Sequence, residues 1–195
     1  MVKGGYKISL EEVLEDGAGK EKLRAIQDLM TLKDGVLDEE KSIEIHKAFK
    51  AKLDENYATM EIKEQPNASK IFAWLRENNI KVALNTGYNK TIATLLLEKL
   101  NWQVGRDIDA LVTADDAKNH RPAPDMILVA NKLLGVENNT VAKVGDSAID
   151  IHEGKNADCA LTIGVTTGAQ TRQQLEAAHP DFVIDNLMEL MGILK

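Results

Sequence analysis

Apolar residues in the first third of the chain recur at helical spacing. Ser9 followed by Glu12 is a capping-box pattern that predicts a helix start, and the glycines shortly after it predict the end of that helix. Helical periodicity returns over residues 20–30 and again over residues 38–58. No run typical of a strand occurs before about residue 79. We therefore expect the first third of the chain to consist of helices alone.

Apolar runs and amphipathic segments alternate in the remainder of the chain. Strands are predicted over residues 81–86, 109–114, 141–146, 160–166 and 182–185. Helices are predicted over residues 67–79, 89–102, 124–135, 149–157 and 171–178. This alternation indicates an α/β fold in which helices cover both faces of a parallel sheet. The all-helical and the α/β parts meet near residues 61–66, so we divide the chain into units 1–62 and 63–195.

Composition narrows the range of partners. Lys and Arg total 24 against 31 Asp and Glu, a net charge of −7, which argues against nucleic acid or an anionic membrane as a partner. No apolar run is long enough to span a membrane, and the first residues lack the apolar core of a signal peptide. The single cysteine, Cys159, cannot form an internal disulfide. We expect a cytoplasmic protein that acts on a small molecule.

Polar residues gather where the predicted strands end. Thr86 and Gly87 follow the first predicted strand, and Asp146 ends the third, with Asp150 four residues beyond it. Arg121 lies just before a predicted helix. Because the carboxyl ends of parallel strands meet at one edge of a sheet, where ligands of such folds bind, we expect these side chains to converge.

Each of these residues suits phosphate chemistry. The hydroxyl of Thr86 and the amides after it can hydrogen-bond phosphoryl oxygens, and the fixed fork of Arg121 matches phosphate geometry. Asp146 is a hard oxygen ligand suited to Mg²⁺, and Asp150 can support it from one helical turn away. Taken singly, each has a structural alternative: Asp146 as a helix cap, Thr86 as part of a turn, Arg121 as a surface cation. Their joint placement favours a site.

Four segments carry a family resemblance. NTGYNK, VTADD, HRPAPDM and KVGDSAIDIHEGKNADC resemble the second, third and fourth motifs of the haloacid dehalogenase (HAD) superfamily, in its phosphonatase-like branch. The resemblance extends from about residue 5 to the C-terminus. It implies a HAD-like, Rossmann-like parallel sheet with a small all-α cap, which residues 1–62 would form. It also implies that Thr86 and Gly87 bind the phosphoryl group, that Arg121 neutralises it, and that Asp146 and Asp150 belong to a Mg²⁺ site.

Lys20 bears on the substrate. Phosphonatases use a cap lysine that forms a Schiff base with an aldehyde, and Lys20 lies where the resemblance would place it. The alternative is a solvated lysine in the first turn of a helix. Cleavage of a carbon–phosphorus bond would need Lys20, whereas hydrolysis of a phosphomonoester would not.

The first motif of the superfamily is missing from this sequence. That motif is a strand ending in Asp-x-Asp, whose first aspartate is the nucleophile. Nothing before Lys7 has a strand pattern, and no aspartate precedes Asp16. The resemblance places the absent strand in the middle of the sheet, between the strands that end at Thr86 and Asp146. We therefore expect a chain that is inactive by itself.

Three explanations of this absence stay open. The first is a truncated or mis-started form of a longer chain, the second is a non-catalytic relative whose flanking strands have closed together, and the third is a chain that receives the strand from a second one. The main hypothesis is a Mg²⁺-dependent hydrolase of a small phosphorylated or phosphonate metabolite. The alternative is a non-catalytic binding protein, with a homodimer formed at the exposed sheet edge. The four histidines show no metal-ligand spacing.

Overall fold

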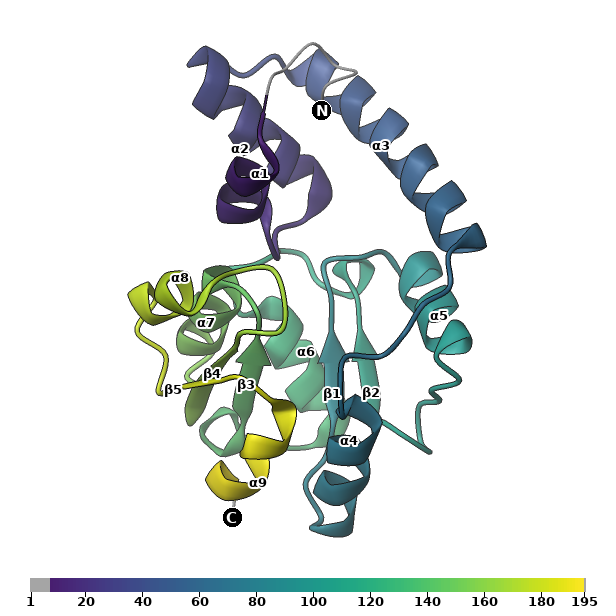
Figure 1. Cartoon of the computed structure of the whole chain (residues 1–195), viewed down its shortest axis with the longest axis vertical. Coiled ribbons are helices and arrows are strands. Elements are labelled where there is room, and N and C mark those ends of the chain that lie inside the picture. The colour runs from purple at the N-terminus through teal and green to yellow at the C-terminus, as the bar shows by residue number, and fades with distance from the viewer. Residues whose placement is uncertain (1–7, 195) are drawn as a thin grey trace.

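The computed structural model describes residues 8–194, and three helices come first along them. They are α1 (Leu10–Gly17), α2 (Lys22–Asp34) and α3 (Glu39–Thr59), which lie together above the rest of the molecule in Figure 1. The side chains of Ser9, Glu21 and Asp38 cap their three N-termini by accepting backbone N–H bonds. The predicted all-helical first third is thus present.

Strands and helices alternate over the rest of the chain. The elements are α4 (Ala68–Glu77), β1 (Ala83–Asn85), α5 (Lys90–Lys99), β2 (Ala110–Val112), α6 (Asp125–Leu134), β3 (Ala142–Gly145), α7 (Ala148–Asn156), β4 (Leu161–Val165), α8 (Arg172–Ala177), β5 (Phe182–Ile184) and α9 (Leu190–Ile193). Short 3₁₀ turns occur at Ala114–Asp116, Asn138–Thr140 and Leu187–Glu189. Each strand lies inside its predicted range but is shorter. The predicted α/β fold with parallel strands is confirmed.

The parallel strands form two sheets. β1 pairs with β2, and β3, β4 and β5 form the second sheet in that order. No backbone pairing joins β1 to β3 among residues 8–194. The sheet is therefore divided at the position where the absence of a central strand was expected.

One apolar core nevertheless spans both sheets. Ile71 of α4, Val82 before β1, Ile163 of β4 and Leu190 of α9 belong to a single cluster of buried side chains. Each is at most 6% exposed, so burial of this cluster contributes about 1.5–3 kcal/mol per large side chain. On the other side, α6 packs on β1 and β2 while α7 packs on β3 and β4. These helices and the shared core hold the two sheets in one unit.

Three contacts fix helices α1–α3 against the α/β part. Gly19, at φ +71°, lies so close to Ser147 and Ile149 that a Cβ atom would come within 2.5 Å of both side chains. Lys99 of α5 donates to the carbonyls of Ala58 and Met60 at the end of α3, at 3.1 and 2.9 Å. The hydroxyls of Tyr57 and Tyr88 also hydrogen-bond across the two parts, as described below.

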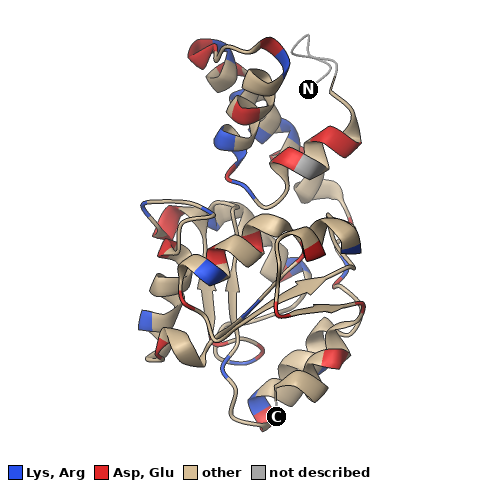
Figure 2. Ribbon diagram, turned by 90° about the vertical axis from the view of Figure 1, so that its left-hand side faces the viewer, with Lys and Arg blue, Asp and Glu red and all other residues tan. Residues whose placement is uncertain are grey.

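Charged residues of both signs are mixed over the surface. In Figure 2, Lys and Arg are interspersed with Asp and Glu on helices α1–α3 and on the α/β part alike. Within residues 8–194, no helix has the length and apolar character that crossing a membrane requires.

Candidate functional site

The loops that follow the strands open on the side of the α/β part that faces helices α1–α3 (Figure 1). The turn after β1 contains Thr86, Gly87 and Tyr88. The backbone N–H of Thr86 donates to Val112 O of β2, at 2.9 Å. Its hydroxyl accepts the N–H of Tyr88 at 3.2 Å, which leaves the hydroxyl proton available to a ligand.

Gly87 lies under the loop that precedes α2. A Cβ atom at Gly87 would stand 3.4 Å from Lys20 O and 3.6 Å from Gly19 O. Both distances are those of ordinary contact for an added Cβ atom, so the turn after β1 and the loop before α2 are separated by about the space of one methyl group. The predicted phosphate-binding turn therefore lies directly beneath the helical part.

A buried cluster of two cations and two carboxylates lies between β1 and β3. Its side chains are Arg121, Lys143, Asp150 and Glu153, exposed by 7, 6, 6 and 0%. Glu153 lies 2.8 Å from both Arg121 Nε and Lys143 Nζ, and Asp150 lies 3.3 Å from Arg121 and 3.1 Å from Lys143. The four charges sum to zero, which is how a protein tolerates ions removed from water.

Asn85 connects this cluster to β1. Its side-chain oxygen accepts from Lys143 at 2.8 Å, and its amide donates to Glu153 at 3.1 Å. Arg121 donates to the backbone carbonyl of Asn85 at 2.9 Å. Because Val82 and Thr86 bond to β2, the carbonyl of Asn85 points to the free edge of β1. The cluster therefore satisfies a backbone group at the edge where the sheet is divided.

Asp150 is ionised within this cluster. Burial alone would raise its pKa, but the charges of Lys143 and Arg121 and the hydroxyl of Ser147 outweigh burial, so the pKa lies below its usual value. Ser147 Oγ donates to Asp150 at 2.6 Å. Asp150 thus faces inward and is already occupied by these partners.

Asp146 lies elsewhere, under the loop after β4. Its Oδ2 accepts the N–H of Ala169 at 2.9 Å, and Gly168 packs so closely on the carboxylate that no Cβ atom could fit there. Asp146 and Asp150 therefore have different partners, Ala169 for the first and Ser147, Lys143 and Arg121 for the second. No group of three or more His, Cys, Asp or Glu side chains that could hold a metal occurs among the described residues. For Mg²⁺, these residues supply one available carboxylate, Asp146, which is an incomplete site.

Lys20 is part of an ion pair on the helical side. It lies in the turn before α2, and its Nζ is 2.7 Å from Asp28, which also binds Arg24 at 2.8 Å. Because Glu21 provides the N-cap of α2, Lys20 precedes the helix and does not lie in its first turn. A cavity of about 420 Å³ opens beside this pair. Its lining comes from both parts and includes Lys20, Arg24 and Asp28 as well as Arg121, His152 and Gln170.

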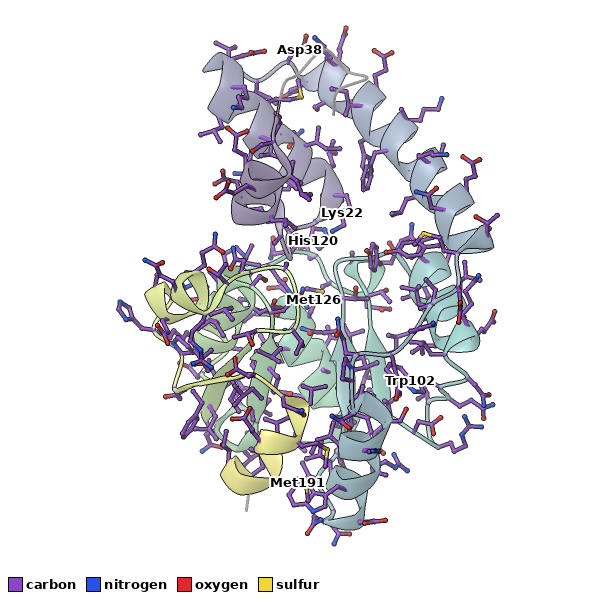
Figure 3. The ribbon with its side chains drawn as sticks, in the orientation of Figure 1. Lys22, Asp38, Trp102, His120, Met126 and Met191 are labelled. Carbon is purple, nitrogen blue, oxygen red and sulfur yellow. The ribbon has the colours of Figure 1, made fainter. Side chains whose placement is uncertain are left out.

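Lys22 is the lysine of α2 whose ammonium lies against the α/β part, and the sequence analysis did not identify it as a candidate. Its Nζ is 5.1 Å from the centre of the Tyr88 ring and 3.4 Å from Lys20 O (Figure 3). Burial lowers the pKa of Lys22, and the positive charge of Arg121 lowers it further. The charges of Glu21 and Asp146 act in the opposite direction and are weaker.

Two tyrosines complete the junction. Tyr57 of α3 and Tyr88 share a hydroxyl–hydroxyl bond of 2.7 Å, and their rings meet edge to face at 5.7 Å. Burial and the bond to Tyr57 raise the pKa of Tyr88, so its hydroxyl stays protonated. Nearby, His120 Nδ1 is buried without a hydrogen-bond partner among the described residues.

The polar core cluster had a detectable sequence pattern. Lys143 interrupts the apolar run VAKVGD, and a charged residue inside a strand buried on both faces requires a partner. The sequence did not show that Glu153 is this partner, because that depends on how α7 packs against β3. Lys22 and Tyr57 had no such pattern, because both occupy ordinary positions on polar helices.

Comparison with known proteins identifies the family. The family model described as haloacid dehalogenase-like hydrolase matches residues 10–165. The chain therefore belongs to the family of haloacid dehalogenase-like hydrolases, as the motifs from Thr86 to Asp150 had suggested.

Individual relatives agree with this assignment. The chain is 31% identical over 156 residues to a phosphonoacetaldehyde hydrolase of Latilactobacillus sakei, which covers 66% of this chain and 57% of that protein. It is 33% identical over 90 residues to pyrophosphatase PpaX of Bacillus velezensis, covering 46% of this chain and 41% of that protein. The chain thus spans about half the length of these relatives. A solved hydrolase from Pseudomonas syringae shares the fold, with a TM-score of 0.85 and 19% identity, over 99% of this chain and 85% of that one.

Proposed function

We propose that this chain forms the substrate-binding part of a Mg²⁺-dependent hydrolase of small phosphorylated or phosphonate metabolites. Residues 1–62 would be its helical cap and residues 63–195 its core. One observation carries the proposal: the turn after β1, with Thr86, and the loop after β3, with Asp146, open on the same side of the α/β part, beneath the loop that precedes α2. In α/β folds this edge is where ligands bind.

The proposed roles follow from the contacts. Thr86 would donate its free hydroxyl proton, and Gly87 its backbone N–H, to phosphoryl oxygens. Arg121 would stabilise the phosphoryl charge from below, because it lines the cavity between the two parts and its Nη1 donates to Gly19 O at 3.4 Å. Lys20 would act on a carbonyl substrate only after release from Asp28.

Mg²⁺, which hydrolases of this family generally use, is the proposed cofactor. Asp146 would be its ligand from this chain, and Asp150 would support Asp146 through the neighbouring Ser147. Further ligands would have to come from the substrate, from water or from residues other than those described.

We infer that the chain binds such a ligand but does not turn it over by itself. No aspartate precedes Asp16 in the sequence, and one oxygen of the Asp146 carboxylate is already bonded to the N–H of Ala169. A covalent aspartyl route needs a carboxylate in line with the phosphorus atom. The proposed cytoplasmic location rests on the single cysteine, which fits a reducing compartment.

The test is calorimetric titration of the protein with methylphosphonate in the presence of Mg²⁺. Binding is expected, and Thr86→Val is expected to weaken it about tenfold because one hydrogen bond to a charged group is lost. A phosphatase assay with p-nitrophenyl phosphate is expected to show no turnover. Hydrolysis that persists in the Asp146→Ala variant would refute the proposed roles.

A second candidate function is a non-catalytic binding protein that associates through its sheet. The edges of β1 and β3 that make no backbone pairing within residues 8–194 favour it, because free strand edges are templates for pairing with another chain; at β1 such pairing would replace the bond from Arg121 to Asn85 O. It predicts a homodimer or a defined complex that is insensitive to Mg²⁺. A monomer in light scattering across a hundredfold range of protein concentration would argue against the homodimer.

A further inference from the structure

Lys22 differs from the other cations at the junction between helices α1–α3 and the α/β part. Lys20 and Arg24 are paired with Asp28, and Arg121 and Lys143 are paired with Asp150 and Glu153. For Lys22, no ion pair occurs among the side chains that the structure describes; its ammonium contacts the Tyr88 ring and, at 3.4 Å, a carbonyl. Glu21, its neighbour, is occupied in capping α2.

This arrangement costs free energy in the absence of a ligand. A partly buried ammonium without a carboxylate loses hydration that a single weak carbonyl contact and a ring do not replace. The lowered pKa of Lys22 has the same cause, burial beside the positive Arg121. An anionic group bound next to Lys22 would remove this cost.

The position of Lys22 specifies which part of a ligand it would meet. Lys20 O neighbours both groups: it is 3.4 Å from Lys22 Nζ and 3.4 Å from the position of a Cβ atom on Gly87. Lys22 is the first residue of α2 and lies beside Tyr88, two residues after Thr86, so a phosphoryl group on the Thr86 turn would have Lys22 on the side of the helices. The Tyr57–Tyr88 hydroxyl pair is adjacent to Lys22 through the Tyr88 ring, and it has one O–H proton left to donate, since only one is used between the two hydroxyls.

We propose that Lys22, together with the Tyr57–Tyr88 pair, binds a second anionic group on the ligand, at the end opposite to the phosphoryl group. The ligand class is a small phosphate or phosphonate that carries a carboxylate or another phosphoryl group. This inference rests on the proposed function of the same site, which supplies the first anionic group. On this proposal Lys22 determines specificity by binding the second anionic group, whereas Arg121 stabilises the phosphoryl group.

Three probes separate the two anionic groups in calorimetric titrations of the full chain with Mg²⁺. Methylphosphonate carries only the first group, phosphonoacetate adds a carboxylate, and methylenediphosphonate adds a second phosphonate. In the Lys22→Gln variant, the preference for one of the two probes with a second anionic group over methylphosphonate is expected to fall about tenfold. The affinity for methylphosphonate itself is expected to change less than about twofold. The probe that loses more identifies the second group.

Control variants assign the effect to Lys22. Lys33→Gln alters another lysine of α2, which is paired with Glu12, and is expected to leave all three affinities unchanged. Lys22→Arg is expected to keep most of the preference, because the cation is retained. Tyr57→Phe is expected to reduce the preference by a smaller factor than Lys22→Gln.

The outcomes distinguish the inference from the proposed function. If methylphosphonate binds and Thr86→Val weakens it, but Lys22→Gln leaves the preference intact, the inference is wrong and the proposed function stands. Loss of the preference in Lys20→Gln alone would assign the role to Lys20 and also overturn the inference. If none of the probes binds the unaltered protein, both fail. Should Lys22→Gln not fold, the ¹³Cε resonance of Lys22 in the unaltered protein must shift on addition of the preferred probe, and an unmoved resonance overturns the inference.

Discussion

At the scale of single residues, Glu153 shows how the molecule accommodates charge in its interior. It is fully buried and accepts from Arg121, Lys143 and Asn85, which belong to three separate segments. None of the three is near it in the sequence. The ion cluster is therefore a product of the fold, and it connects the two sheets through side chains where backbone bonds are absent.

Replacement of Glu153 by Gln is expected to lower the free energy of unfolding by about 3–5 kcal/mol, because two buried cations would share one remaining carboxylate. Urea denaturation measures this difference. Glu176→Gln is the matched control: Glu176 is 56% exposed and pairs with Arg172 at 3.6 Å, so its loss should cost less than about 1 kcal/mol. Equal costs for the two variants would contradict the structural role of the cluster.

Asp150 predicts how stability depends on pH. Its pKa is lowered in the folded protein, so the ionised form stabilises the fold at pH values above the unfolded pKa of about 3.9. As the pH falls below that value, this stabilisation is lost, because the unfolded chain takes up the proton first. Unfolding free energies measured at pH 6 and near pH 3 should differ less in Asp150→Asn than in the unaltered protein. An equal difference in both would show that Asp150 does not contribute.

At the scale of elements, periodicity located almost every helix and strand, and capping determined where the helices begin. The capping box at Ser9 and Glu12 predicted the start of α1 correctly. The start of α2 was predicted too early, because the carboxylate of Glu21 accepts the N–H groups of Leu23 and Arg24. This shift leaves Lys20 outside the helix and makes Lys22 its first residue.

The end of α3 depends on an element from the other part of the molecule. Lys99 of α5 binds the carbonyls of Ala58 and Met60, which lack partners in the helix. Lys99→Met is expected to raise the hydrogen-exchange rate of the last turn of α3 about fivefold, the equivalent of about 1 kcal/mol. Lys50→Met, at an exposed position of α3, serves as the control and should leave that rate unchanged. Identical exchange in both variants would mean that α3 ends independently of α5.

At the scale of the whole molecule, Gly19 couples the helical part to the α/β part. Its positive φ and its contact with Ser147 and Ile149 both exclude a side chain. Gly35 has nearly the same φ, +73°, but nothing lies within 4 Å of the position of its Cβ atom. The two glycines therefore differ only in what surrounds them.

Gly35→Ala is expected to cost about 1–2 kcal/mol of stability from backbone strain alone. Gly19→Ala should cause the same backbone strain. It should also push the helical part away from the α/β part, because the new Cβ atom would collide with Ser147 and Ile149. Limited proteolysis in the connecting segment 60–66 measures the displacement, and cleavage is expected to be faster in Gly19→Ala than in Gly35→Ala. Equal cleavage rates would show that the two parts do not depend on this contact.

The sequence by itself determined the α/β class, the order of the elements and the turns that carry Thr86 and Asp146, because periodicity and capping act over a few neighbouring residues. It also predicted the division between β1 and β3 that the structure shows within residues 8–194. Only the tertiary structure decided which charges meet. It placed Asp150 with Arg121 and Lys143, and it gave Lys22 no ion-pair partner among the described side chains. The reason is physical: a buried charge takes the nearest opposite charge in space, and that neighbour depends on how distant segments pack.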